Sequence, residues 1–459
     1  MTESRVCSGP MSRRSLLKAG CLGWGGLSLA DLLRGRAAAN NSPPQTSVIL
    51  VWLVGGQSHL ETYDMKPNAP REIRGDFSPI STNVPGVDIC ELLPRHAKLA
   101  DKFTLIRSLE HAFPGHVDGA QMVLSGHPPK GVNPLTEIPD FPDLGCVYKA
   151  VTPPRANGLP QNIAMRHDLY YVGPAYLGAA NGACVVPTRT ANKPDFYVPS
   201  LDVPIHQVGR LDSRNELRKS FDRIHRNVDA GGVMQAMDQF DTEALRMLTG
   251  NRAQKAFDLS AVDPRTRDRY GRSLFGQGLL LARRLVEAGV GFVSVDGGWF
   301  QDVHPMLADN WDDHETNKHI FQAMHHRLPP YDQAVTALIE DLHQTGLDQN
   351  VLLVVMGEFG RTPQIFYSNG TPGRGHHPGA NTALVSGGGF QMGQVIGETD
   401  SRGERPRNRT LHPTDLLATI YRFLGVNYQQ ELRNFNGRPI PILPRGEPIR
   451  ELLASSRSL

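Results

Sequence analysis

One uninterrupted apolar run, SVILVWLV at residues 47–54, decides the fold class. Its residues are apolar at successive positions and rich in β-branched side chains, so the pattern predicts a strand buried on both faces. Such strands are typical of parallel sheets that helices cover on both sides. Similar runs recur at residues 103–109, 291–295, 351–356 and 382–386.

Amphipathic patterns with helical spacing lie between and after these runs. They cover residues 215–228, 233–248, 273–288, 316–327, 331–344 and 413–424. Strands that alternate with long helices indicate an α/β protein. We therefore expect a central, mostly parallel sheet with helices on both faces.

The composition supports one large folded domain. Of the 459 residues, 39% are apolar, which is enough to bury a core, and the 46 Gly and 35 Pro show no period, which favours ordered loops. We expect a single domain over residues 40–459, with a Pro-rich, loop-rich insertion at about 152–213 and a helical lid or subdomain at about 214–264. The net charge of +2 gives no basic field, so no nucleic-acid partner is expected.

The first 39 residues have the pattern of an export signal. Arg13-Arg14 precede Ser15-Leu16-Leu17, a short apolar stretch follows, and Ala37-Ala38-Ala39 offers a cleavage site. The arginine pair resembles a twin-arginine signal, so we expect a periplasmic or extracellular protein. The apolar stretch is shorter than the roughly 20 residues that span a bilayer, and no transmembrane segment is expected in the mature chain.

The three cysteines after this signal, Cys90, Cys146 and Cys184, are widely spaced. No C-x-x-C motif occurs in the chain, which excludes a zinc ribbon and a thioredoxin-type site.

Polar and ionisable side chains follow the ends of the predicted strands, where open α/β sheets bind their ligands. The first two strands are followed by Ser58, His59, Asp64 and Lys66, and by His116 and Asp118. The later segments carry Asp312, His314, Glu358, Arg361, Arg374, His376 and His377. Any one histidine could be a hydrogen-bonded structural residue, but together these imidazoles and carboxylates predict a divalent-metal site.

The order of these segments resembles the alkaline-phosphatase-like superfamily, which includes sulfatases and cofactor-independent phosphoglycerate mutases. A closer resemblance covers nearly the whole mature chain: behind the twin-arginine signal, the sequence looks like an exported bacterial family catalogued as domain of unknown function 1501. The blocks that carry this resemblance are Gly55–Pro67, Gly357–Pro363, Gly373–Pro378 and Gly387–Asp400.

The superfamily resemblance implies roles for some of these residues and departs from the pattern at two others. It places Asp312, His314, Glu358 and either His376 or His377 around zinc, manganese, iron or calcium, and His116 falls at the position of the nucleophile. Gly56 stands where an Asp ligand is expected, and Phe359 stands where a His ligand is expected. The two-metal mechanism of the superfamily therefore does not transfer directly.

Two functions remain open from the sequence. The first is hydrolysis of phosphate or sulfate esters, in which Arg361 or Arg374 neutralises developing charge and His116 is a phosphoryl acceptor or general base. His116 could instead be a hydrogen-bonding residue at a helix start, and Asp64 and Lys66 a buried ion pair. The second function is non-catalytic binding of an anionic small molecule, a sulfated or phosphorylated glycan, or a partner protein in the cell envelope.

Overall fold

The computed structural model describes residues 45–129, 140–155, 157–165, 173–194, 196, 198, 247, 251–298, 300–307 and 309–453. All of these except Gln45 belong to one compact unit, Thr46–Leu459. The expected export signal and the helices expected at 215–228 and 233–248 lie outside the described residues. So does most of the expected subdomain at 214–264, apart from Met247 and the part that begins at residue 251.

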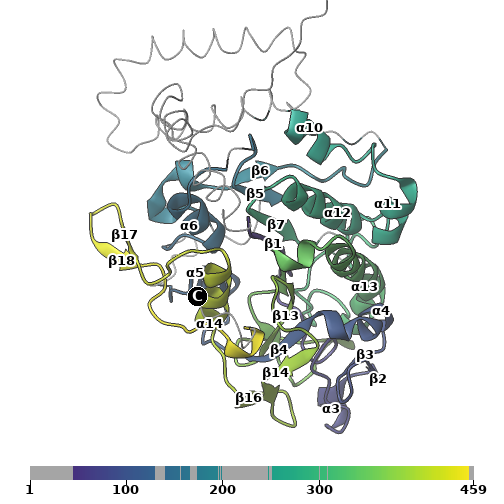
Figure 1. Cartoon of the computed structure of the whole chain (residues 1–459). Helices are drawn as coiled ribbons and strands as arrows, with labels where there is room; N and C mark the ends of the chain where they lie inside the picture. Colours follow the sequence, from purple (N-terminus) through teal and green to yellow (C-terminus); the bar gives the residue numbers. More distant parts are fainter. Residues whose placement is uncertain are drawn as a thin grey trace, which may run out of the picture. The chain divides into compact units, whose positions relative to one another are not determined.

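An eight-stranded sheet forms the centre of the unit (Figure 1). Its order is β14 (Gln394–Ile396), β4 (Thr104–Leu109), β13 (Asn381–Gly387), β8 (Val351–Met356), β1 (Ser47–Trp52), β7 (Phe292–Asp296), β5 (Asn162–Met165) and β6 (Cys184–Val186). Every neighbouring pair is parallel except those that involve β13. The expectation of a mostly parallel sheet is therefore confirmed.

Strand β1 lies inside the sheet and contributes to a core on each face. Ile49 and Val51 pack into the core that contains α12 (Leu274–Glu287) and α13 (Ile320–Gln344). Val48, Leu50 and Trp52 pack into the opposite core, with α5 (His116–Ser125), α6 (Leu144–Val151) and α14 (Pro413–Phe423). Alternate residues of a strand point to opposite faces, so the apolar run at 47–54 follows from helices covering both faces.

Two of the expected helices match α12 and α14 closely, and two others join. The patterns at 316–327 and 331–344 form one helix, α13, which continues through Pro329 and Pro330. Proline in a helix interior removes a backbone hydrogen bond. Leu328 and Tyr331 on either side are fully buried, so packing holds the helix together at this point.

The segment expected to be a loop-rich insertion also builds part of the sheet. Within 152–213, β5 and β6 add two parallel strands beyond β7. These strands have only four and three residues, which is too short for a clear periodic signal in sequence.

The remaining elements are short. The helices are α3 (Arg71–Arg74), α4 (Pro94–Lys98), α10 (Asn251–Phe257) and α11 (Pro264–Tyr270). The short helices of 3₁₀ type are Ala100–Lys102, Ala175–Leu177, Ala179–Asn181, Leu347–Gln349 and Arg450–Leu452. The strands form two-stranded ribbons: β2 (Pro79–Ser81) with β3 (Asp88–Cys90), β9 (Gly360–Arg361) with β12 (His376–His377), β10 (Phe366–Ser368) with β11 (Thr371–Gly373), β15 (Glu398–Thr399) with β16 (Pro406–Asn408), and β17 (Glu431–Arg433) with β18 (Pro439–Pro441). Among the described residues, no helix combines the length and apolar content needed to cross a membrane.

Candidate metal centre

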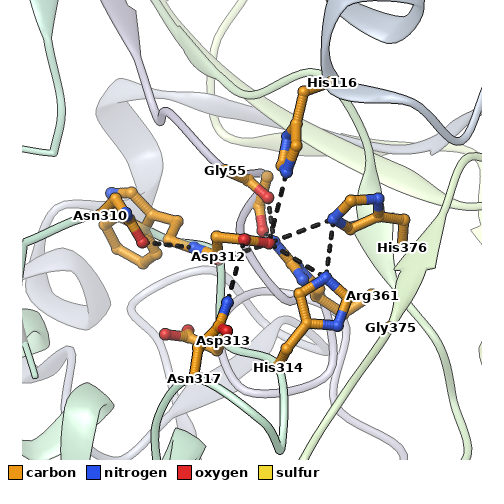
Figure 2. Close-up of polar contacts among 12 residues, drawn as sticks. Gly55, His116, Asn310, Asp312, Asp313, His314, Asn317, Arg361, Gly375 and His376 are labelled. Atoms are coloured by element: carbon orange, nitrogen blue, oxygen red, sulfur yellow. Dashed lines mark hydrogen bonds and ion pairs between the residues drawn. The ribbon is translucent and has the colours of Figure 1, made fainter.

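Side chains from distant parts of the chain meet beyond the carboxyl ends of the central strands (Figure 2). Asp312 and His314 come from the segment after β7, His376 comes from β12, and His116 is the first residue of α5. Parallel strands end at the same edge of a sheet, so the segments that leave them gather there. These four residues are called the metal cluster below.

Three imidazoles surround one carboxylate oxygen in the metal cluster. Asp312 Oδ1 lies 3.1 Å from His376 Nε2, 3.3 Å from His314 Nε2 and 3.5 Å from His116 Nε2. His314 Nε2 and His376 Nε2 are 2.9 Å apart. Each of the four side chains is about a quarter exposed or less, so the cluster is partly accessible from the solvent.

The outer nitrogens of two of these histidines are anchored to acceptors. His116 Nδ1 lies 2.7 Å from Glu358 Oε1, and His376 Nδ1 lies 2.7 Å from the carbonyl oxygen of Pro114. Because both partners accept hydrogen bonds, Nδ1 of each imidazole donates to them and Nε2 is the atom that faces Asp312. Metal-binding histidines in proteins are held in this way, and three imidazoles with one carboxylate suit a tetrahedral divalent ion such as zinc. The residues therefore fit a metal ion.

The surroundings of Asp312 keep its carboxyl group ionised. Burial alone would raise the pKa of this carboxyl group, but hydrogen bonds from the three histidines and the charge of Arg361 hold the pKa well below its usual range. Burial likewise opposes protonation of His116, yet its hydrogen bonds to Asp312 and Glu358 raise its pKa to about 9. The pKa of His376 is lowered, mainly by burial. A cation that binds here must displace the proton of His116, so its affinity depends on pH.

Arg361 positions Asp312 and does not reach the solvent. Its guanidinium donates to Asp312 Oδ1 at 2.7 Å, and its remaining hydrogen bonds go to carbonyl oxygens, including those of Gly56 at 2.9 Å and Trp311 at 3.0 Å. The side chain is fully buried. The sequence led us to expect that Arg361 neutralises charge on a substrate, but its donors are already used within the protein.

Arg374 was the other residue expected to neutralise charge on a substrate, and its donors are also used within the protein. It is fully buried and forms an ion pair with Glu61, to which its Nε donates at 3.0 Å. Its other donors reach the carbonyl oxygens of Ile73, Thr362 and Pro363. Glu61 lies in the block after the first strand, but its partner is 313 residues away, so nothing in the local sequence indicated the pair.

Glu358 lies behind His116 and not beside the three Nε2 atoms. Its Oε1 accepts hydrogen bonds from the backbone N–H of Gly55 at 2.9 Å and from His116 Nδ1, and the side chain is fully buried. This arrangement orients His116, so Glu358 supports the metal cluster from behind, where a direct ligand was expected.

His376 belongs to the metal cluster, whereas its neighbour His377 does not. His377 Nε2 donates to the carbonyl oxygen of Glu404 at 2.6 Å. Successive residues of a strand point to opposite sides, which separates the two imidazoles of β12. The sequence left the choice between them open, and the geometry assigns the role to His376.

The other candidate residues have structural surroundings. Ser58, His59 and Asp64 are buried: Ser58 Oγ donates to Glu61, His59 Nε2 donates to the carbonyl oxygen of Gly403 at 2.9 Å, and Asp64 pairs with Lys66 at 3.0 Å. Burial lowers the pKa of His59 to about 4, so its imidazole is neutral. Asp118 lies in the first turn of α5, and burial raises its pKa.

The two residues that depart from the superfamily pattern touch each other. A Cβ atom at Gly56 would lie 2.6 Å from Cδ2 of Phe359, so the ring occupies the space that a side chain at residue 56 would need. The ring centroid of Phe359 is 4.3 Å from that of His376 and 5.3 Å from that of His116. Phe359 is thus an apolar wall against the metal cluster. Among the described residues, His116, Asp312 and His376 are the one group of His, Cys, Asp or Glu side chains whose ligand atoms lie close enough together to hold a metal ion.

Two asparagines near Asp312 escaped the sequence analysis. Asn317 Nδ2 donates to Asp312 Oδ2 at 3.3 Å, and Asn310 Oδ1 accepts the backbone N–H of Asp312 at 2.9 Å (Figure 2). Asparagine is common in loops, so only its contact with Asp312 identifies it as part of the site.

Solved structures share a distant similarity with the chain. A PsFucS1 sulfatase from Pseudoalteromonas sp. is 14% identical, with 86% of this chain and 70% of that chain covered and a TM-score of 0.35. The lipoteichoic acid synthase LtaP from Listeria monocytogenes is 9% identical, with 84% of this chain and 73% of that chain covered and a TM-score of 0.32. The C-terminal periplasmic domain of EcEptC from Escherichia coli, in complex with Zn, is 10% identical, with 88% of this chain and 94% of that chain covered and a TM-score of 0.36.

These identities and TM-scores are too low to transfer an activity, so the chemistry of this chain follows from its own metal cluster. No curated protein matches the sequence significantly. One family matches over residues 45–453, which is nearly all of the chain after the expected signal. The chain therefore belongs to the family described as protein of unknown function (DUF1501).

Proposed function

We propose that this protein is a metal-dependent hydrolase of phosphate or sulfate esters. The observation that carries the proposal is the convergence of three imidazole Nε2 atoms on Asp312 Oδ1, with two of the imidazoles fixed through Nδ1. A divalent ion held there would supply a Lewis acid that attracts and polarises an anionic ester. The candidates for this ion are zinc, manganese, iron and calcium.

The residues around the metal cluster prepare it for such a substrate. Glu358 holds His116 in the orientation that directs Nε2 inward, and Arg361 and Asn317 hold the two oxygens of Asp312. Phe359 excludes water from one side of His376, which strengthens electrostatic interactions at the cluster. His116 is engaged by both Asp312 and Glu358, so we assign it a metal-binding role in place of the nucleophilic role expected from the sequence.

The test is hydrolysis by the purified full-length protein. The protein is stripped with a chelator, reloaded separately with zinc, manganese, iron or calcium, and assayed with p-nitrophenyl phosphate and p-nitrophenyl sulfate. Turnover that requires one of the metals, and that Asp312→Ala abolishes, would support the proposal. Failure of every metal-loaded form to hydrolyse either ester would overturn it.

A second candidate function is anion binding without catalysis. It is favoured by the burial of Arg361 and Arg374, because no donor of either guanidinium is left for charge that develops on a substrate. In that case the metal-loaded protein would bind inorganic phosphate, sulfate or a sulfated glycan in calorimetric titrations without any turnover. Asp312→Ala would abolish this binding as well.

We also propose that the protein is exported through the twin-arginine pathway, on the strength of Arg13-Arg14 and the short apolar stretch behind them. Cell fractionation tests this: replacing both arginines by lysine should retain the protein in the cytoplasm, while Arg5→Lys should not.

A further inference from the structure

A pocket whose lining includes none of the four metal-cluster residues differs from that cluster in chemical character. Its volume is about 750 Å³, within the range of small-molecule binding sites. It is formed where β4 ends, where α5 ends and where α14 begins. The lining residues used below are Ala112, Phe113, Met122, Pro378, Arg405 and Arg445.

The wall of this pocket is largely apolar. Met122 is buried in α5, and the side chains of Ala112, Phe113 and Pro378 extend the apolar surface toward the solvent. An apolar concave wall favours a ligand with an aromatic or aliphatic body, because burial of its surface is the main source of binding free energy.

Two of the histidines that line the pocket have ring nitrogens engaged within the protein. His111 Nε2 donates to the carbonyl oxygen of Glu358 at 2.7 Å, and its Nδ1 accepts the backbone N–H of Phe113 at 3.2 Å. Both nitrogens of a neutral imidazole are therefore occupied. His377 Nε2 is likewise committed to Glu404.

Two arginines supply the positive charge of the pocket. Arg405 and Arg445 line it, and both are exposed. Among the residues that the structure describes, neither side chain has an ion pair or a hydrogen bond. In this they differ from Arg361 and Arg374, whose donors are satisfied within the protein. Glu110 is the one acidic residue in the lining, so the two arginines give the lining an excess of positive charge.

We propose that this pocket binds a small organic anion with an apolar body, such as an aromatic sulfonate or carboxylate. The apolar wall would take the body, and the guanidinium groups of Arg405 and Arg445 would take the anionic group, a geometry for which arginine is well suited. The pocket uses none of the metal-cluster side chains, so this inference goes beyond the proposed hydrolysis and does not depend on it.

A pair of matched fluorescent probes tests the proposal. 8-Anilinonaphthalene-1-sulfonate carries an anionic group on an aromatic body, and N-phenyl-1-naphthylamine has the same body without the charge. Both are titrated into the purified full-length protein, its Arg405→Gln/Arg445→Gln variant and an Arg265→Gln control. Arg265 is an exposed arginine on α11 that does not line the pocket.

The proposal predicts saturable binding of the sulfonate to the wild type and to the control. The double variant should bind it at least about tenfold more weakly, while its affinity for the uncharged probe changes less than about twofold. Ala112→Trp places a large side chain in the pocket from an exposed position and should weaken the binding of both probes. The proposal is overturned if the wild type binds neither probe, if the double variant binds the sulfonate as well as the wild type, or if it loses both probes equally.

Discussion

The Nε2 atoms of His314 and His376 face each other at 2.9 Å, with Asp312 Oδ1 beside both. Nδ1 of His376 lies 2.7 Å from the carbonyl oxygen of Pro114 and donates to it, so its Nε2 is the ring nitrogen that faces the cluster. A divalent cation bound here would be held by both nitrogens and the carboxylate, which is the physical basis of the metal-binding predictions below.

Replacing His376 by alanine should remove the bound metal, whereas replacing its strand neighbour His377 should not. His376 supplies an Nε2 atom to the cluster, while His377 is hydrogen-bonded to Glu404. Metal content per folded molecule, measured by inductively coupled plasma mass spectrometry, distinguishes the two variants. Equal metal content in both would contradict the assignment.

Glu358→Gln should weaken metal binding without abolishing it. The amide oxygen can still accept hydrogen bonds from Gly55 and His116, but the negative charge that makes His116 a better ligand is lost. Loss of such a supporting carboxylate costs about 10–100-fold in affinity. Competition with a chelating dye gives the affinity. The side chain of Glu404 is about half exposed and lies outside the cluster, so Glu404→Gln is the control and should keep the wild-type affinity.

Gly55→Ala should reduce both stability and metal binding. Gly55 has φ of +105°, and a Cβ atom there would lie 2.4 Å from the backbone nitrogen of Asp312. Gly86 has φ of +79° with nothing within 4 Å of the added atom, so Gly86→Ala isolates the cost of the backbone conformation, about 1–2 kcal/mol. Urea unfolding should show a larger loss for Gly55→Ala, and only this variant should lose metal. Similar losses in the two variants would count against the steric explanation.

Arg374→Met should destabilise the protein but leave the metal cluster intact. The change leaves Glu61 buried without its partner, which costs about 3–5 kcal/mol in comparable buried pairs. Adding Glu61→Gln should restore part of the free energy of unfolding, because it removes the unpaired charge. A substrate-facing role for Arg374 would instead give normal stability with lost turnover, and that result would refute the structural role assigned here.

Stability should fall as the pH drops from about 6.5 to about 4, partly through His59. Burial holds the folded-state pKa of His59 near 4, below the ordinary value of 6.5. In this window the unfolded chain binds a proton that the folded chain does not, so acid favours unfolding by at most about 1.4 kcal/mol per pH unit. Urea unfolding of chelator-treated protein at several pH values measures the slope. His59→Gln, which does not titrate, should have a shallower slope, and unchanged slopes would exclude this contribution.

Much of the fold could be predicted from local sequence pattern. The runs at 47–54, 351–356 and 382–386 became β1, β8 and β13, because strands buried on both faces must be apolar at successive positions. The three-residue strand β6 gave no such signal. The sequence pattern also did not predict that two helices join into α13, because proline normally ends a helical pattern. The helix continues through its prolines because tertiary packing stabilises it there.

The residue types that form the metal cluster could be predicted from the sequence, but the role of each residue could not. Asp312, His314 and His376 follow strands in the sequence, and the edge of a parallel sheet brings such residues together. The choice of His376 over His377 depends on which side of a two-residue strand each imidazole faces. The structural roles of Arg361 and Arg374 depend on acceptors that are distant in the chain, such as Gly56 and Glu61.

The amino-acid sequence by itself determined the α/β class, the family and the set of side chains from which a metal site could be built. Local apolar pattern and residue type are properties of the chain, and they need no contact information. The tertiary structure alone decided which imidazoles share Asp312, which carboxylate stands behind His116 and which arginines remain available to a ligand. Those outcomes are set by pairs of atoms hundreds of residues apart, whose distances exist only once the sheet has formed.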